Sequence, residues 1–363
     1  MRNILKDRRF FVFKAGSVGF VAIALALLCV FSCNNLLVLG GGSLVIAMPG
    51  TRAATASRFT IELTGTNGTT QSKTLAGGTT TAQFDDLDPD TYDIIVKGID
   101  EAGAIVLGGS SSATVVAGKT ASTTVELVEV VNNFDSLQQA MTAGGTVYVV
   151  NDITVTESLI INQDVIIRAL NKDVTLNFTA NSGSLFTVTN SATLTIGGGD
   201  CRLTVDGNGQ IYTRSDPLLN ITSGTVHLYG TITNGVNDNS AGGIIVSGPT
   251  SKLYMYEGAT VSNCKCSNKY GRGGAISVTA HGCMFMSGGD ITGNESTYCA
   301  AAVYVYENGS LTMSGGTISK NTASGSDGGP AAVEISESSK FTQTGGSITG
   351  NSPRDIVNKS TSQ

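Results

Sequence analysis

Tryptophan is absent from the 363 residues, proline occurs 6 times, and only 14% of the residues are charged. The two histidines, His227 and His281, are far apart, and Cys264-Lys265-Cys266 has no second cysteine pair, so no zinc site is expected. The net charge of −6 and the lack of a basic stripe argue against nucleic acid as a partner. We therefore expect no metal, no cofactor and no nucleic acid.

Long stretches rich in Ala, Glu, Lys and Leu are also missing beyond the first thirty residues, whereas glycine occurs 46 times and Thr, Ser, Val and Ile are frequent. β-Branched residues favour strands, so the expected fold class is all-β. We expect a signal peptide over residues 1–32, a tether over 33–42, a small β-sandwich over 43–131 and a parallel β-helix over 132–363.

The N-terminus has the layout of a secretory signal, because five basic residues precede the apolar run Ala15–Phe31. The sequence Val30-Phe31-Ser32-Cys33 that ends the run resembles the lipobox of bacterial lipoproteins. The resemblance implies export, lipid attachment at Cys33 and anchorage in the bacterial outer membrane or at the cell surface. The alternative is a membrane-spanning helix with Cys33 as an ordinary thiol, although the apolar run is short for a span.

Residues 43–131 read as short strands separated by turns, with strict alternation over Phe59–Thr64. The segment from Phe84 to Tyr92 resembles the corner of immunoglobulin-like and carboxypeptidase-regulatory-like modules, with Asp90 where that pattern prefers glycine. The segment and the strand after it are rich in acids, which could form a calcium site or a solvated turn: Asp85, Asp86, Asp88, Asp90 and Asp93. Their spacing lacks the EF-hand pattern, which favours the solvated turn.

An amphipathic helix is expected next, since Phe134, Leu137, Ala140 and Met141 recur at helical spacing after a capping residue, Asn133 or Asp135. This stretch resembles the entrance to a pectate-lyase-like parallel β-helix. In that architecture a short helix covers the open end of a right-handed coil, where apolar core and unpaired strand edges would otherwise be exposed.

Two phrases then repeat with a period of about 30 residues, which is the length of one turn of a solenoid. The first runs from a glycine pair to an asparagine, as in Gly315–Asn321, and its β-branched residues are Ile232, Val261, Ile291, Ile318 and Ile348. The second phrase ends at Ile245, Ile276, Val303 and Val333. Each period is therefore interpreted as one coil of a β-helix.

Within each coil, alternation predicts that Leu311 and Met313 point inward, and Tyr254 and Tyr256 are placed at the same inward positions. Asn294, Asn321 and Asn351 are expected at corners with left-handed geometry, close enough to form an amide ladder that Cys264 and Gly235 interrupt. The paired phrases resemble the repeats of polymorphic outer-membrane proteins. Those proteins usually end in a membrane barrel, so this chain would depend on lipid for its anchorage.

Acids that converge with a basic residue would indicate a polysaccharide-cleaving enzyme. The best candidates lie between residues 200 and 216, where a solvated turn is the alternative: Asp200, Arg202, Asp206, Arg214 and Asp216. A basic loop with Lys265, Lys269 and Arg272 could contact an anionic glycan or be a polar corner. Tyr270 and Tyr298 fall in loops and could stack on sugars, whereas core packing is expected for most other tyrosines.

The function expected from these features is a lipid-anchored, adhesin-like binding or shielding scaffold without catalysis, with host protein or glycan as possible partners. No catalytic residue is assigned, and Cys33 is the one assigned site. The alternative is a polysaccharide lyase or glycosidase that acts on an acidic glycan through the 200–216 face. The odd number of cysteines after Cys33 leaves at least one thiol without a partner in its own chain, and Cys264 or Cys266 could link chains.

Overall fold

The computed structural model describes residues 40–49, 56–209, 216–238, 240–267, 273–325 and 331–360. The expected signal peptide, Cys33 and the rest of the tether up to residue 39 lie outside these residues. No helix within the described part is long and apolar enough to cross a membrane. Strands dominate the described chain, which confirms the all-β class.

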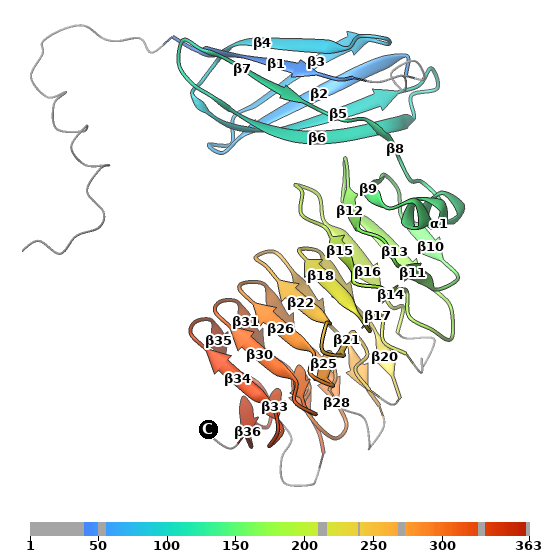
Figure 1. Ribbon diagram of the computed structural model, residues 1–363, viewed down its shortest axis with the longest axis vertical. Helices are drawn as coiled ribbons and strands as arrows, with labels where there is room; N and C mark the ends of the chain where they lie inside the picture. The colour runs from blue at the N-terminus through green and yellow to red at the C-terminus, as the bar shows by residue number, and fades with distance from the viewer. Residues whose placement is uncertain are drawn as a thin grey trace, which may run out of the picture. The chain divides into compact units, whose positions relative to one another are not determined.

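Residues from Gly42 to Glu129 form two sheets with a shared apolar core (Figure 1). One sheet has the order β4-β1-β7 and the other β3-β2-β5-β6-β8. The strands are β1 (Gly42–Ala47), β2 (Arg58–Gly65), β3 (Thr70–Ala76), β4 (Thr81–Leu87), β5 (Asp90–Ile99), β6 (Ile105–Val115), β7 (Thr120–Thr124) and β8 (Val128–Glu129). The predicted alternation is confirmed in β2, where Phe59, Ile61 and Leu63 are fully buried.

The acidic turn of this region is held by hydrogen bonds within the protein. Tyr92 is fully buried, and its hydroxyl donates to the carbonyl oxygen of Asp88 at 3.0 Å. The Asp90 carboxylate accepts from the backbone N–H groups of Asn67 and Thr91 and from the Thr66 hydroxyl, and these bonds, led by that of Thr66, lower the pKa of Asp90. The described residues contain no group of three or more His, Cys, Asp or Glu that could hold a metal ion.

The predicted capping helix is present as α1 (Phe134–Ala143). Asn133 is its N-cap, since the side chain accepts from the backbone N–H of Ser136 at 2.9 Å, and the Ser136 hydroxyl lies 3.3 Å from the backbone N–H of Asn133. Leu137 and Met141 are buried against the first coil. The helix contacts β9, β10 and β11, which begin the three long sheets.

The rest of the chain is a right-handed parallel β-helix with three sheets of eight strands each (Figure 1). The first sheet contains β9 (Gly145–Val149), β12 (Val165–Ala169), β15 (Ala192–Ile196), β18 (Gly224–Leu228), β22 (Lys252–Met255), β26 (Cys283–Met286), β30 (Ser310–Met313) and β34 (Lys340–Gln343). The second contains β10 (Ile153–Val155), β13 (Val174–Phe178), β16 (Leu203–Asp206), β19 (Thr231–Thr233), β23 (Thr260–Ser262), β27 (Asp290–Thr292), β31 (Thr317–Ser319) and β35 (Ser347–Ile348).

The third sheet contains β11 (Leu159–Ile161), β14 (Phe186–Val188), β17 (Leu219–Ile221), β21 (Ile244–Ser247), β25 (Ile276–Thr279), β29 (Val303–Val305), β33 (Val333–Ile335) and β36 (Ile356–Asn358). A short fourth sheet joins the middle coils, with β20 (Val236–Asn237), β24 (Lys265–Cys266), β28 (Glu295–Ser296) and β32 (Thr322–Ala323). Each coil contributes one strand to each long sheet, so the inward side chains of all three sheets share one core.

The first repeated phrase keeps its predicted register, because its β-branched residues pair one after another in the second sheet, from Ile232 with Val261 to Ile318 with Ile348. The second phrase needs one correction. Ile244, and not Ile245, pairs with Ile276 and is fully buried. The repeat in this coil is one residue longer than the sequence pattern indicated, which moves Ile245 to the outer face.

The glycine pair of the first phrase is required at the turn that follows the first sheet. A Cβ at Gly315 would lie 2.1 Å from the carbonyl oxygen of Ser287 in the preceding coil. Gly316 has a φ of 81°, a conformation that other residues rarely adopt. Stacking at about 4.8 Å therefore leaves no room for a side chain at the first position and favours glycine at the second.

The predicted amide ladder is present at the corner after the second sheet. The Asn321 side chain accepts from the backbone and side-chain nitrogens of Asn294, at 3.0 and 2.8 Å, and donates to Asn351 Oδ1 at 2.9 Å. Asn294 in turn accepts from the backbone N–H of Cys264, where the ladder stops. The left-handed residue is the one before the asparagine, for example Lys320 with a φ of 57°, so that part of the prediction was wrong.

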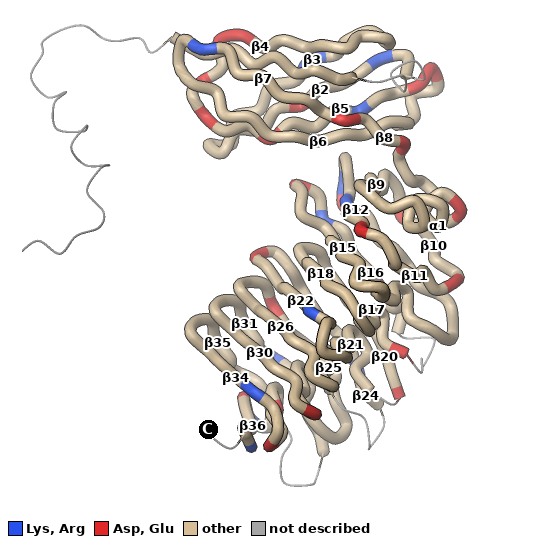
Figure 2. The backbone as a smooth tube through the Cα atoms, viewed as in Figure 1, with Lys and Arg blue, Asp and Glu red and all other residues tan. Residues whose placement is uncertain are grey.

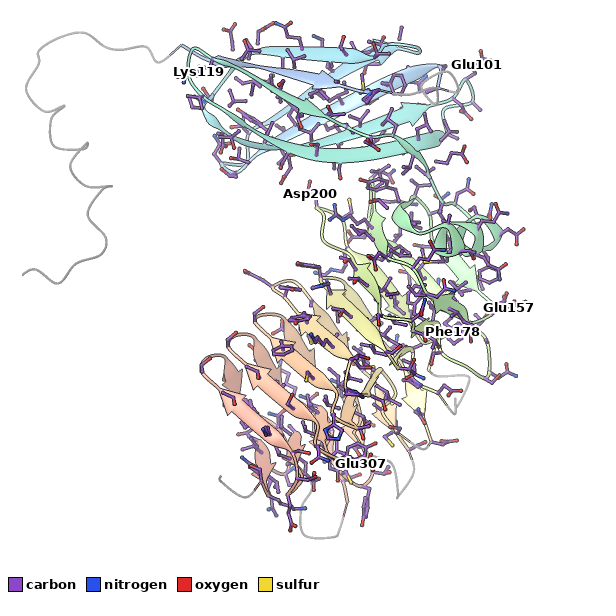
Figure 3. All side chains as sticks on the ribbon, in the orientation of Figure 1. Glu101, Lys119, Glu157, Phe178, Asp200 and Glu307 are labelled. Carbon is purple, nitrogen blue, oxygen red and sulfur yellow. The ribbon has the colours of Figure 1, made fainter. Side chains whose placement is uncertain are left out.

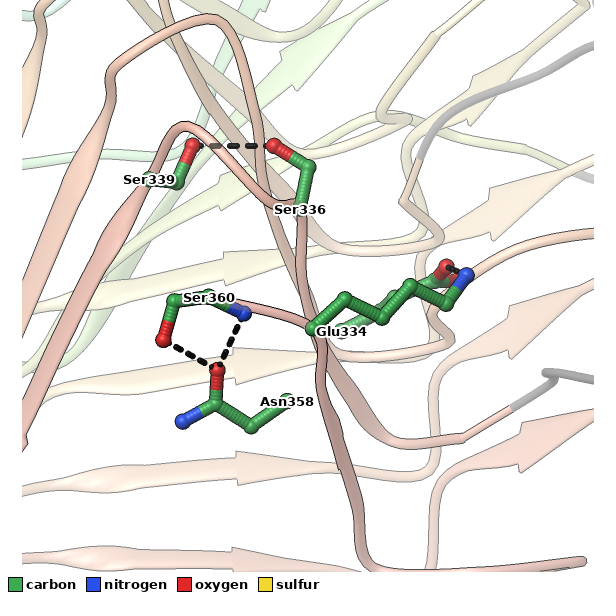
Figure 4. A network of polar contacts seen from close by, with 6 residues as sticks. Glu334, Ser336, Ser339, Asn358 and Ser360 are labelled. Atoms are coloured by element: carbon green, nitrogen blue, oxygen red, sulfur yellow. Dashed lines mark hydrogen bonds and ion pairs between the residues drawn. The ribbon is translucent and has the colours of Figure 1, made fainter. Parts of the chain in front are cut away.

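The last described coil is less buried than those before it. Phe341 and Ile348 are only partly buried, whereas Leu311 and Ile318 at the same positions of the previous coil are buried. Polar contacts tie its end together (Figure 4). Lys359 Nζ lies 2.8 Å from the buried Glu334 carboxylate, which raises the pKa of the lysine.

Candidate functional site: an aromatic strip on the first sheet

The outer face of the first sheet carries tyrosines that the sequence analysis placed inside. Leu253 and Met255 are fully buried and pair with the inward Met284 and Met286 of the next strand. Tyr254 and Tyr256 therefore alternate to the outside, and the prediction that they point inward was wrong. Leu253, Tyr254, Met255 and Tyr256 are all apolar or aromatic, so hydrophobic alternation alone does not distinguish the two faces.

These tyrosines belong to a continuous set of five rings on β18, β22 and β26 and the residues just after them, which we call the aromatic strip: His227, Tyr229, Tyr254, Tyr256 and Phe285. Tyr254 lies between His227 and Phe285, with ring centroids 5.1 and 4.8 Å away. Tyr229 and Tyr256 stack at 4.4 Å with an interplanar angle of 5°. The rings pack against one another between coils, so most ring faces are already in contact and ring edges face solvent.

A hydrogen bond joins the two columns of the strip. The Nδ1 atom of His227 lies 2.8 Å from the Tyr256 hydroxyl. Burial lowers the pKa of His227, so its imidazole is neutral at pH 7, and burial also raises the pKa of Tyr256. The strip therefore presents uncharged donors and acceptors along its edge.

The strip ends at Tyr229, where a ring face remains uncovered by another ring. In the preceding coil, the chain just after β15 consists of glycines and has no side chain at this place. A Cβ added at Gly198 would lie 3.4 Å from Cδ2 of Tyr229. This missing side chain leaves a hollow of about 510 Å³, which we call the ring slot. Its described lining residues are Ile166, Arg168, Thr195, Gly198, His227, Tyr229 and Tyr256.

Arg168 supplies the one positive charge among these lining residues. Its Nε atom is buried and has no hydrogen-bond partner among the described residues, and the arginine forms no ion pair within them. A buried N–H donor without an acceptor is costly. Asp200 lines a neighbouring hollow that also includes Arg168, and it does not line the ring slot.

Of the candidates for catalysis in residues 200–216, only Asp200 and Arg202 share a hollow among the described residues. Asp200 lies at the tip of the loop between β15 and β16 (Figure 3), and lines a hollow together with Arg202 and Glu257. Asp206 lies at the far end of β16, where Oδ1 accepts from the backbone of Asn208 at 2.7 Å and from the Asn234 side chain at 3.0 Å. Asp206 therefore holds a turn.

The two remaining candidates of that segment are Asp216 and Arg214. Asp216 accepts from the backbone N–H of Gly183 at 3.1 Å, which links it to a different corner of the coil. Arg214 lies outside the described residues.

The predicted basic loop can be followed only at Lys265, which lies 3.0 Å from the Glu295 carboxylate. Lys269, Tyr270 and Arg272 lie outside the described residues. Figure 2 shows Lys and Arg dispersed among acidic residues in the described part of the coil. Tyr298 is 37% exposed, as expected for a loop, and does not belong to the aromatic strip.

Cys264 is a buried thiol, and burial raises its pKa to about 12, which makes it a poor nucleophile. Its inward position argues against the suggested link between chains at this residue.

Sequence reasoning missed the aromatic strip because its members are spread over residues 227–285 and meet only through the coil register. The signal that could have found it is the repeat itself, since aligning the coils on Met284 and Met286 puts His227, Tyr254 and Phe285 in one column. The chain matches no protein-family model, no curated protein and no solved structure.

Proposed function

We propose that the protein is an exported binding scaffold, anchored in a bacterial membrane by lipid on Cys33, whose outer β-helix surface binds glycan. The observation that carries the proposal is the aromatic strip with its ring slot, because an uncovered aromatic face beside polar donors is suited to a sugar ring. The proposal includes an immunoglobulin-like N-terminal domain and repeats of the polymorphic outer-membrane type, for which the buried Tyr92 and the paired phrases are the support.

Binding without cleavage is favoured over lyase or glycosidase activity. Cleavage of a glycan requires acid and base groups that converge on one bond. Asp200 and Asp206 lie at opposite ends of β16 and its preceding loop, and Asp206 is occupied by the hydrogen bonds of a turn. Asp200, Arg202 and Glu257 share one hollow, so they are the residues to change if cleavage is found.

The test uses the purified full-length protein in detergent with a panel of acidic and neutral polysaccharides, with and without calcium. Mass spectrometry would measure chain length, and pull-down would measure retention. We expect unchanged chain lengths and retention of at least one glycan. Shortened chains would contradict the proposal and support the lyase or glycosidase, and the absence of any retained glycan would contradict glycan binding.

The anchor is tested separately by growing cells with radiolabelled fatty acid. We expect label in the wild-type chain and none in Cys33→Ser, which should also appear in the soluble fraction. Label retained in Cys33→Ser would contradict the assignment of Cys33.

A further inference from the structure

We propose that the ring slot binds a pyranose ring that carries a carboxylate, with the sugar stacked on Tyr229 and the carboxylate paired with Arg168. This inference depends on the proposed glycan-binding function and adds the site and the chemical class of ligand. The slot lies on the outer face of the first sheet, within the coils of β12, β15 and β18.

The stacking surface is the free face of Tyr229. Its other face is covered by Tyr256 at 4.4 Å, and the ring is 36% exposed. In the preceding coil the equivalent place is held by Gly198, so the regular stack of rings lacks one member there. A sugar ring has apolar C–H faces that can stack on an aromatic ring, and it would lie on the side of Tyr229 where the stack lacks a ring.

The charge of the slot selects the ligand. Arg168 is the only charged residue among the seven described lining residues, and its guanidinium has no acidic partner within ion-pair distance in the described chain. Arg168 lines the slot, and a guanidinium binds a carboxylate through paired hydrogen bonds. A neutral sugar would offer Arg168 no oppositely charged group.

The polar edge of the slot matches the hydroxyl groups of a sugar. The Thr195 side chain, the Tyr256 hydroxyl and the neutral His227 line the same hollow. Thr195 pairs with His227 in register, so its side chain lies in the same outward column as that ring. These groups can both donate and accept, as sugar hydroxyls require.

The first experiment compares two ligands that differ only in charge. The full-length protein would be titrated calorimetrically with a glucuronate-containing oligosaccharide and with the same oligosaccharide after reduction of its carboxyl groups to alcohols. We expect the acidic form to bind about tenfold or more tightly, in line with a charge-assisted pair. Arg168→Gln should bind both forms with the weaker affinity. Equal affinity of the wild-type protein for the two forms would overturn the inference.

Two variants test the stacking and one serves as a matched control. Tyr229→Ala should weaken binding of the acidic oligosaccharide about tenfold, whereas Tyr306→Ala, which removes a tyrosine just after β29 of the third sheet, should leave it unchanged. Thr195→Phe should fill the slot and extend the column of His227, so binding should be lost while the melting temperature is unchanged or raised. Tight binding by Thr195→Phe or by Tyr229→Ala would overturn the inference.

These outcomes are separate from those of the proposed function. If the polysaccharide panel shows a retained neutral glycan and the acidic oligosaccharide does not bind, the charged slot is wrong and the scaffold proposal stands. If the panel shows cleavage, the scaffold proposal fails whatever the slot binds.

Discussion

Asn321 illustrates, at the scale of one residue, how the corners of this coil are closed. Its side chain accepts two hydrogen bonds from Asn294 and donates to Asn351 and to the carbonyl oxygens of Ile291 and Ser319. The residue is fully buried. Each asparagine thus satisfies backbone groups of its own and of the neighbouring coil, which water cannot reach.

Replacing Asn321 by leucine should therefore destabilise the protein by about 3 kcal/mol, since several buried donors and acceptors lose their partner at once. Urea unfolding followed by circular dichroism measures the effect. Asn358→Ala is the control, because that asparagine is exposed in β36, and its change should stay within about 0.5 kcal/mol. A loss below about 1 kcal/mol in Asn321→Leu would mean that the ladder contributes little.

Lys320 has an unfavourable backbone conformation for a lysine, with a φ of 57°. The same corner in other coils has Asn234, Asn263, Gly293 or Gly350. Asparagine tolerates this conformation better than lysine. Lys320→Asn should raise the free energy of unfolding by about 0.5 kcal/mol. Lys172→Asn, at an exposed bend without positive φ, should give no gain. A loss of stability in Lys320→Asn would show that the lysine makes a contact that offsets its strain.

The unit of interest at the scale of elements is the outer face of the first sheet. Inward positions of β22, β26 and β30 are occupied by Leu and Met, which form the shared core, whereas the outward column changes from Thr195 through three rings to Thr312. Along each strand, the outward residue lies between two inward core residues. The outward residues of adjacent strands are register partners, so neighbouring rings are about 4.8 Å apart and stack. One outward residue from each of three adjacent strands therefore contributes to a continuous aromatic surface.

This surface should be sensitive to acid through His227. Burial lowers the pKa of His227 in the folded chain, so its ordinary value of about 6.5 applies only after unfolding. The unfolded chain then binds the proton more readily, and the stabilisation by neutral His227 is complete above pH 6.5 and is lost as the pH falls through the folded-state pKa.

We therefore expect the melting temperature to decrease as the pH is lowered from 7.5 to 5, and to decrease less in His227→Gln. Calorimetry at several pH values measures the slope. His281→Gln controls for the number of histidines and should keep the wild-type decrease, because His281 does not belong to the strip. An unchanged slope in His227→Gln would contradict the assignment.

At the scale of the whole β-helix, the two ends of the described coil differ. The outer edges of β9, β10 and β11 lie under α1, whose Leu137 and Met141 are buried. Strands β34, β35 and β36 each occur at the end of a sheet, and within the described chain no element pairs with their outer edges. A solenoid is held together by contacts between neighbouring coils, so a coil with one neighbour is less stable than one with two.

Hydrogen exchange should reveal this difference. Amides of β34 to β36 should exchange faster than those of β26, β27 and β29, because local opening at an uncovered end disrupts only one interface. Amides of β9 to β11 should be as protected as the middle coils, owing to α1. Leu137→Ala should remove that protection selectively. Equal protection of β34 to β36 and the middle coils would show that the last coil is covered in solution.

Local sequence features specify the architecture, because each coil of a solenoid corresponds to one repeat of the sequence. Ile232 to Ile348 recur once per coil, Gly315-Gly316 occurs where stacked backbones leave no room for a Cβ, and Asn133 with Leu137 and Met141 specifies the capping helix. These are local rules of turn, cap and alternation, and they hold without knowledge of distant residues.

The face that each apolar residue takes, and the side chains that it meets, depend on how the coils pack in the folded chain. Ile244 rather than Ile245 is inward because one coil is a residue longer, and Tyr254 is outward because Leu253 and Met255 fill the core beside Met284 and Met286. The ring slot arises from Arg168, Gly198 and Tyr229, which lie in three different coils. A shift of one residue reverses the face of a whole strand, and the packing of the shared core selects between the two alternatives.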